Sequence, residues 1–236
     1  MAKGLTQFKS KGVFGMYTWS EWCPTEAKSA GIRCFPMLWG DKNKDKFKKI
    51  AQKGYSTYAL GMNEVNIKGQ STMSPGRGAW MWRTYMLPLQ AKGYKLISPS
   101  TANGKSAAAW MKEFFKTCPE CKKSTTAVAA HYYGTDPQKF IDYMTDLHNQ
   151  LQMPLWITEI GCQDYSGKNK QCTQSQANNY LNTVITWMDK TSWVQAYFWY
   201  GMFHTSRVGV SSVNGMFNAN ATLNSFGKLY LAKAAA

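Results

Sequence analysis

Two glutamates stand at the ends of strand-like apolar runs, where a charged side chain is least expected. Glu64 follows the run Tyr58-Ala-Leu-Gly-Met-Asn63, and Glu159 lies within Leu155-Trp-Ile-Thr-Glu-Ile160. Burial of a carboxylate in apolar surroundings is costly because its charge loses water. Most other acidic residues lie in lysine-rich, polar or turn-like stretches. Either glutamate alone could be a structural carboxylate held by hydrogen bonds, but two of the same kind indicate a shared cleft.

Paired carboxylates across a cleft are the groups that glycoside hydrolysis needs. One serves as acid/base and the other as nucleophile or base. The tryptophans near both glutamates favour this function over a purely structural role, because sugar rings have apolar C–H faces that pack on flat aromatic side chains.

The elements that must position these carboxylates alternate between apolar runs and helical patterns. Strands are predicted at Val13–Trp19, Arg33–Trp39, Ser56–Met62, Lys95–Ser98, Ala127–Tyr133, Leu155–Ile160 and Gln195–Tyr200, with an eighth near Val208–Val213. Helices are predicted at Asp41–Lys53, Arg77–Lys92 (kinked at Pro88), Lys105–Lys116, Pro137–Leu151, Thr173–Lys190 and Ser225–Lys233. Alternation at this spacing is typical of parallel strands, and seven or eight of them favour a single α/β domain, a compact (β/α)8 TIM barrel over residues 1–236.

In such a barrel the active site lies at the C-terminal ends of the strands. The predicted strand ends bring an amide, an imidazole and several aromatic rings to the same face as the two glutamates. These candidate substrate-binding residues are Trp39, Asn63, His131, Tyr132, Tyr133 and Trp199. Carbohydrate clefts need this mixture, although the aromatic residues could equally belong to the core or rim and His131 could be a structural histidine.

The six cysteines fall into three pairs of near neighbours in sequence. Of the fifteen possible pairings we favour Cys23–Cys34, Cys118–Cys121 and Cys162–Cys172, which implies an oxidising compartment. Cys118-Pro-Glu-Cys121 could also be read as a redox motif or half of a zinc site, but no second CxxC exists and the chain has three histidines.

The net charge of +15 would suit nucleic acid or an anionic surface. The lysines are, however, spread along the chain, chiefly on predicted helices such as Asp41–Lys53, so we interpret them as surface character suited to adhesion to an anionic wall. No run reaches the roughly 18 apolar residues of a membrane span. The first residues lack an apolar signal region, yet the cysteines indicate secretion, so we expect a signal segment outside this sequence.

At these motifs the chain resembles glycoside hydrolase family 128, the Asl1-like fungal β-1,3-glucanases. The matching stretches follow one another along nearly the whole chain: Met37–Gly40, Leu60–Asn66, Gln70–Pro75, His131–Gly134, Trp156–Gly161, Cys162–Gly167 and Tyr197–Gly201. Any one of them would be a weak signal, whereas the set is specific.

The resemblance implies a (β/α)8 barrel in which Glu64 is the acid/base and Glu159 the nucleophile of a retaining mechanism. The two carboxyls should then be about 5–5.5 Å apart, with Glu64 protonated near neutral pH and Glu159 charged. Two positions depart from the family pattern. Val65 stands where proline is common, and Tyr132 stands where tryptophan is common, which puts subsite affinity and chain-length preference in question.

The leading hypothesis is therefore a secreted, monomeric endo-β-1,3-glucanase of the cell wall, with no metal or other cofactor and β-1,3-glucan or its oligosaccharides as partner. The alternatives are an exo-acting or oligosaccharide-preferring glucanase, or a glucan-binding protein with little turnover. A nucleic-acid binder ranks last, because two glutamates in one cleft would repel phosphate, and no membrane partner is expected.

Overall fold

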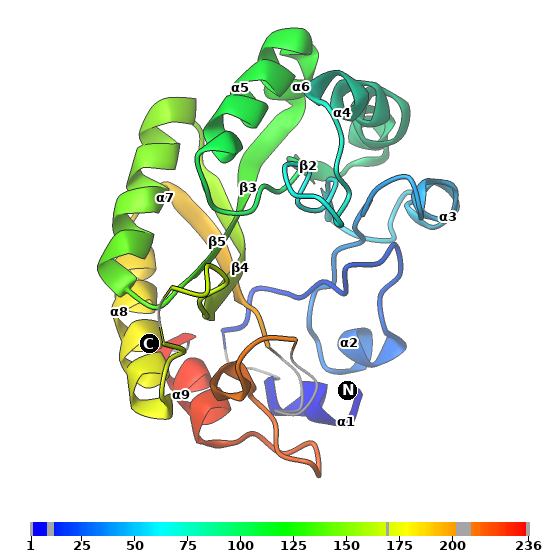
Figure 1. Ribbon diagram of the computed structural model, residues 1–236. Helices are drawn as coiled ribbons and strands as arrows, with labels where there is room; N and C mark the ends of the chain where they lie inside the picture. The colour runs from blue at the N-terminus through cyan, green and yellow to red at the C-terminus, as the bar shows by residue number, and fades with distance from the viewer. Residues whose placement is uncertain (1, 9–11, 169, 202–208, 235–236) are drawn as a thin grey trace.

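A computed structural model describes residues 2–8, 12–168, 170–201 and 209–234. Its centre is one all-parallel sheet with strand order β1 (Tyr58–Leu60), β2 (Lys95–Ile97), β3 (Thr125–Gly134), β4 (Leu155–Cys162) and β5 (Val194–Trp199). The strands curl around a common axis and the helices lie outside the curl (Figure 1). The predicted α/β class and parallel sheet are confirmed.

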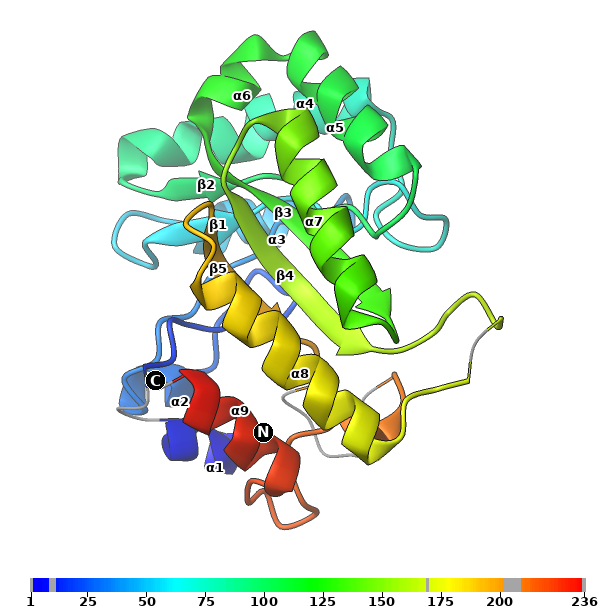
Figure 2. The ribbon, with the colours of Figure 1, turned by 90° about the vertical axis from the view of Figure 1, so that its left-hand side faces the viewer.

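Five helices begin and end close to the predicted positions: α3 (Lys44–Ile50), α5 (Ser106–Thr117), α7 (Pro137–Leu151), α8 (Gln174–Asp189) and α9 (Ser225–Ala234). The sequence analysis does not predict α6 (Pro119–Ser124) or the short N-terminal helices α1 (Ala2–Leu5), η1 (Thr6–Phe8) and α2 (Thr25–Ser29). Figure 2 shows α7 and α8 lying across the outer side of β3 and β4. Asp136 caps α7 and Thr173 forms a capping box with Gln176 at α8, as their sequences predict.

The predicted kinked helix at Arg77–Lys92 is three consecutive pieces. They are α4 (Pro75–Met81), the π-helical turn η2 (Trp82–Met86) and the 3-10 helix η3 (Leu87–Lys92). The change of helix type next to Pro88 agrees with the missing N–H of proline. Gly93, which ends η3, has a φ of 89°, the left-handed conformation expected of a glycine between this helix and the next strand.

The first two predicted strands are not regular strands. Residues 13–19 and 33–39 extend the sheet beyond β1 through isolated parallel bridges, Met16 with Cys34 and Met37 with Leu60. Pro36 has no N–H to donate to a ladder, and Trp19 leaves the extended region with a φ of 54°. The described residues therefore form a curled half-barrel in place of the eight regular strands of a complete barrel.

The eighth predicted strand, near Val208–Val213, is wrong for its described part. Ser212–Asn214 form a 3-10 helix, η5, and residue 208 lies outside the described residues. Between β5 and residues 13–19, no strand pairing occurs among the described residues. Side chains close the gap instead, with the rings of Tyr17 and Phe198 5.5 Å apart.

The core has two parts, one on each side of the curled sheet. The inner cluster is aromatic and consists of Tyr17, Phe35, Met37, Leu60, Ile97, Ala127, Ala129, Trp156 and Ala196. The outer cluster packs the sheet against the helices. All three predicted disulfides, Cys23–Cys34, Cys118–Cys121 and Cys162–Cys172, are present. Within the described ranges, no helix is both long and apolar enough to cross a membrane.

Candidate active site

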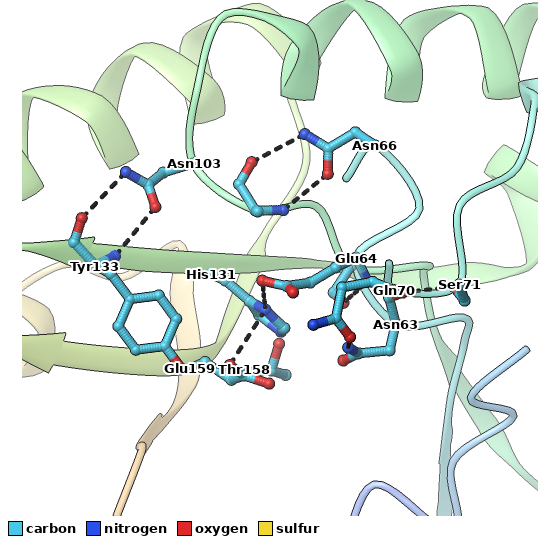
Figure 3. Close-up of polar contacts among 12 residues, drawn as sticks. Asn63, Glu64, Asn66, Gln70, Ser71, Asn103, His131, Tyr133, Thr158 and Glu159 are labelled. Carbon is cyan, nitrogen blue, oxygen red and sulfur yellow. Dashed lines mark hydrogen bonds and ion pairs between the residues drawn. The ribbon is translucent and has the colours of Figure 1, made fainter. Parts of the chain in front are cut away.

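Glu64, His131 and Glu159 meet at the C-terminal ends of the parallel strands. Glu64 follows β1, His131 lies in β3, and Glu159 lies beside it in β4, where the two residues are register partners. Nδ1 of His131 is 3.0 Å from Oε1 of Glu64 and 3.5 Å from Oε2 of Glu159. One oxygen of each carboxylate and Nδ1 all lie within 4.8 Å of one another. Figure 3 shows the imidazole between the two carboxylates.

The backbone of Glu64 has an unusual conformation. Its φ is 47°, in the left-handed region that costs a side-chain-bearing residue on the order of 1–2 kcal/mol. Hydrogen bonds hold it there: Ser100 Oγ accepts from the Glu64 N–H at 3.0 Å, and the Val65 N–H donates to Ser100 O at 3.1 Å. Trp19, which contacts the carboxylate of Glu159, also has a positive φ. Strain at both residues is typical of a functional site.

Glu159 receives hydrogen bonds on both carboxylate oxygens. Trp19 Nε1 donates to Oε1 at 2.6 Å, and the Tyr133 hydroxyl donates to Oε2. The preceding residue, Thr158, is held by the Tyr17 hydroxyl, which donates to its carbonyl oxygen at 2.6 Å. Donors of this kind stabilise the charged form of a carboxylate in a largely dry site.

His131 is completely buried and does not line the cleft. Burial works against its charged form, but the negative charges of Glu159 and Glu64 and the hydrogen bond to Glu64 outweigh it and raise the pKa of His131. The imidazole is thus placed to hold the two carboxylates close together as a shared cationic partner.

This arrangement predicts a pH-dependent stability. Because the pKa of His131 is raised in the folded state, its stabilising contribution is complete below about pH 6.5, its ordinary value, and is lost as pH rises through the folded-state pKa. We expect the Tm of the wild type to fall through that window relative to the Tm of His131→Gln. Thermal unfolding across pH 5–9 checks this, with His148→Gln as the matched histidine control. Parallel Tm curves for wild type and His131→Gln would contradict it.

Tyr133 is positioned by a pair of hydrogen bonds to its backbone. Asn103 Nδ2 donates to the Tyr133 carbonyl at 3.2 Å, and the Tyr133 N–H donates to Asn103 Oδ1 at 3.1 Å (Figure 3). Burial and the neighbouring charge of Glu159 raise the pKa of the Tyr133 hydroxyl well above its ordinary value, so it stays a donor. Asn103 therefore fixes the strand end from which this hydroxyl reaches Glu159.

Removal of that hydroxyl should weaken the function of Glu159. A hydrogen bond to a charged group contributes about 1.5–3 kcal/mol, so Tyr133→Phe is expected to lower the kcat/KM of the glycoside hydrolysis predicted from the sequence about 10- to 100-fold. Steady-state kinetics measure the effect. Tyr180→Phe is the matched control, since the buried Tyr180 hydroxyl on α8 has no hydrogen-bond partner in the described structure and lies outside the cleft. Equal losses in both variants would contradict a role specific to Tyr133.

The carboxylates open into a cleft of about 870 Å³. Its lining is rich in aromatic and polar side chains: Trp19, Trp39, Asn63, Glu64, Ile67, Gln70, Ala102, Asn103, Tyr132, Tyr133, Gly134, Thr135, Asp136, Lys139, Glu159, Asp164, Tyr165, Ser166, Tyr200 and Gly209. This volume and this mixture suit a ligand with both apolar faces and many hydroxyls.

The structure brings most of the residues predicted from the sequence into this cleft. Trp39, Asn63, Tyr132 and Tyr133 line it together with the two glutamates. Tyr132 is largely buried and packs edge-on against Phe140 of α7. Oδ1 of Asn63 is buried without a hydrogen-bond partner in the described structure.

Trp199 is not in the cleft. Its ring packs between Tyr180 of α8 and Phe226 of α9, on the outer side of β5. Side chains alternate between the two faces of a strand, so the neighbouring Tyr200 lies on the cleft side instead. The period of two in the sequence shows that Trp199 and Tyr200 lie on opposite faces, and the structure shows that Tyr200 is on the cleft side.

Three further residues line the cleft but are not among the site residues predicted from the sequence: Trp19, Tyr165 and Lys139. Trp19 ends the first predicted strand, so its position was a usable signal. Tyr165 and Lys139 come from the segments after β4 and at the start of α7, where nothing in the sequence indicates the direction of a side chain.

Two carboxylates and an imidazole could also ligate a divalent cation. Both oxygens of Glu159, however, already accept hydrogen bonds from Trp19 and Tyr133, and Nδ1 of His131 is directed at the carboxylates. These donors occupy positions that a cation would need. The arrangement therefore fits a hydrogen-bonded carboxylate pair better than a metal centre.

Comparison with curated proteins gives one distant relative. The chain is 23% identical over 228 residues to alkali-sensitive linkage protein 1 of Schizosaccharomyces pombe, covering 95% of this chain and 41% of that protein. It thus spans about two fifths of the length of this relative.

Solved structures of low sequence identity share the fold. An exo-β-1,3-glucanase of family 128, subgroup VI, from Aureobasidium namibiae is 21% identical with a TM-score of 0.81, covering 96% of this chain and 89% of that one. A subgroup I endo-β-1,3-glucanase from Amycolatopsis mediterranei with laminaritriose is 22% identical, with a TM-score of 0.77 and coverage of 98% and 95%. A subgroup VII oligosaccharide-binding protein from Trichoderma gamsii is 23% identical, with a TM-score of 0.79 and coverage of 99% and 91%.

The family itself is identified by a match over almost the whole chain. The family described as Glycosyl hydrolase catalytic core matches residues 2–230, which include both glutamates and every strand of the sheet. The resemblance seen in the sequence motifs is therefore confirmed, and the chain belongs to the glycosyl hydrolase catalytic core family as an Asl1-like member of glycoside hydrolase family 128.

Proposed function

We propose that this chain hydrolyses β-1,3-glucosidic bonds of β-1,3-glucan with retention of configuration. One observation carries the proposal: two buried carboxylates share one cleft, with an oxygen of each within 4.8 Å of the other. Retaining glycosidases hold their carboxyls about 5–5.5 Å apart, whereas inverting enzymes leave about 6.5–9.5 Å for a water molecule.

Glu159 is the proposed nucleophile. Its two hydrogen-bond donors, Trp19 and Tyr133, favour the charged carboxylate that must attack the anomeric carbon. In the first step a Glu159 oxygen bonds to that carbon as the glycosidic C–O bond breaks, and Glu64 gives its proton to the leaving oxygen. In the second step Glu64 removes a proton from water, the water oxygen bonds to the anomeric carbon, and Glu159 is released.

Glu64 is the proposed acid/base because its environment differs from that of Glu159. Its side chain is 11% exposed and lines the cleft, and its carboxylate contacts Nδ1 of His131. A group that gives and regains a proton in each turnover needs this access to the leaving oxygen and to water. His131, which does not reach the cleft, is proposed to position both carboxylates instead of binding sugar.

Trp39, Asn63, Tyr132 and Tyr133 are the proposed sugar contacts, with Tyr200 in place of Trp199. The structures of the related Amycolatopsis mediterranei enzyme with laminaritriose, laminaripentaose and laminarihexaose support a β-1,3-linked glucose chain as the ligand. Asn63, which precedes Glu64 and lines the cleft, carries an amide that can form a hydrogen bond with a sugar hydroxyl.

We propose endo action, since a cleft of about 870 Å³ with aromatic lining on several sides has room for more than the end of a chain. The test is the length of products released early from a linear β-1,3-glucan whose reducing end has been reduced. Mixed oligosaccharides support endo action, and a single short product supports the exo alternative suggested by the relatives from Aureobasidium namibiae and Cryptococcus neoformans. Binding without any product supports the alternative suggested by the oligosaccharide-binding relative.

We further propose that residues 1–236 act as one monomeric catalytic domain, secreted to the cell wall, with a complete (β/α)8 barrel. Three disulfides and the fungal relative support the compartment. The bridges at Met16 and Met37, together with the Tyr17–Phe198 contact, support closure of the barrel.

A further inference from the structure

The excess positive charge of the chain is confined to its first half. Residues 1–123 contain 21 Lys and Arg against seven Asp and Glu, whereas residues 124–236 contain seven against six. Most of this charge lies in residues 41–123, which contain 16 Lys and Arg against five Asp and Glu and form the side of the molecule that carries α3 to α6 (Figure 1). That side is therefore strongly basic.

The charge is densest around α3, on the outer edge of the molecule. Residues 41–53 contain six lysines and two aspartates, and Phe47 is the residue of α3 that is buried in the core. Lys92, at the end of η3, donates to the Gln52 side chain at 2.9 Å, which places η3 against the end of this segment. We call five of the exposed lysines here the α3 basic face; they are Lys46, Lys48, Lys49, Lys53 and Lys95.

The acidic residues between positions 41 and 123 do not pair with the lysines of the α3 basic face. Glu64 belongs to the cleft, and the other acids of the described part of residues 41–123 already lie close to basic groups. The ion pairs are Arg77–Asp41 at 2.6 Å, Lys44–Asp45 at 3.8 Å, Lys116–Glu113 at 3.4 Å and Arg83–Glu120 at 2.5 Å. None of the face lysines takes part in an ion pair with a described residue. The face thus keeps its full positive charge.

We propose that the α3 basic face docks the protein on an anionic polysaccharide. The opposite charge of such a chain complements the lysine row, and none of the five lysines lines the cleft. The protein could therefore bind a neutral glucan in the cleft and an anionic glycan on the α3 basic face at the same time. None of the exposed large apolar side chains belongs to α3, and the hydroxyl of the exposed Tyr55, two residues after Lys53, accepts from the Cys23 N–H at 2.8 Å, which argues against insertion into lipid. The three disulfides indicate a compartment outside the cell interior, which argues against nucleic acid.

The test is retention on a polygalacturonate gel as a function of NaCl. The face variant combines Lys46→Gln, Lys48→Gln, Lys49→Gln and Lys53→Gln. The control variant removes the same charge from exposed lysines elsewhere, with Lys122→Gln, Lys123→Gln, Lys190→Gln and Lys228→Gln. Because ionic binding of a polyanion weakens with salt in proportion to the charges it neutralises, the face variant should bind about tenfold or more weakly at low salt (about 50 mM NaCl), with a shallower salt dependence.

The control variant should stay within about threefold of the wild type. Equal weakening of both variants, or no wild-type retention, overturns the proposal. Tighter binding to duplex DNA or to anionic vesicles than to polygalacturonate overturns the choice of polysaccharide. Turnover of soluble β-1,3-oligosaccharides, measured in parallel, should be unchanged in the face variant, so a failure of docking is distinguishable from a failure of the proposed hydrolysis.

Discussion

Glu159→Gln is expected to lower the kcat of β-1,3-glucan hydrolysis on the order of 10⁴-fold or more, with ligand binding retained. Glutamine keeps the shape of the side chain and the Trp19 and Tyr133 partners nearby, but its neutral amide cannot form the glycosyl ester. Initial rates on linear glucan and a binding titration with laminaritriose measure the two effects separately.

Glu21→Gln is the matched control for this substitution. Glu21 is also a buried carboxylate, with Oε2 accepting from Asn43 Nδ2 at 3.1 Å, but it does not line the cleft. It should keep hydrolysis within about twofold of the wild type. Addition of azide to Glu159→Ala should produce the α-glucosyl azide, because the small anion attacks from the side that the carboxylate vacated. A Glu159→Gln enzyme with more than a tenth of wild-type activity would contradict the assignment.

Glu64→Gln is expected to lower hydrolysis of the glucan about 10²- to 10⁴-fold, the usual contribution of a general acid. The loss should be much smaller for the first step with a dinitrophenyl β-glycoside, whose leaving group needs no proton. Stopped-flow release of dinitrophenolate measures that step.

The azide product also separates the two carboxylates. With Glu64→Ala, azide should give the β-glucosyl azide, since Glu159 still forms the intermediate and azide replaces the activated water. An α-azide from this variant, or an equal loss on both substrates, would contradict the acid/base role. The same Glu21→Gln control applies.

Much of the helical framework could be predicted from local signals in the sequence. Asp136 with Pro137 predicts the start of α7, and the capping box of Thr173 predicts the start of α8; both are present because these side chains satisfy N–H groups in their own first turn. The disulfides were equally predictable, since each joins cysteines no more than 11 residues apart.

The ends of the half-barrel could not be predicted in the same way. The apolar runs at residues 13–19 and 33–39 resemble strands, but whether they form regular ladders depends on neighbours distant in sequence and on local breaks at Pro36 and Trp19. The 3-10 helix at Ser212–Asn214 replaces a predicted strand. There the Asn214 side chain bonds to the backbone of Cys162 in β4, a contact that no local pattern indicates.

The sequence predicts which site residues lie at the ends of the strands, but it does not predict how those residues contact one another. Glu64 and Glu159 could be brought together because parallel strands end at one edge of the sheet. The burial of His131 between them depends on the β3–β4 register, which contains an irregularity next to His131. Trp199 and Tyr200 are both aromatic, and the sequence does not show which face of β5 turns inward.

The most direct test of the account is the configuration of the first product. Proton NMR of linear β-1,3-glucan during the first minutes of wild-type hydrolysis reports the anomer released before mutarotation. We predict the β-anomer, with the α-anomer growing in later, because carboxylates with oxygens within 4.8 Å of one another fit the short separation of retaining enzymes and not the wider one of inverting enzymes. Initial release of the α-anomer, or no new reducing ends at all, would contradict it.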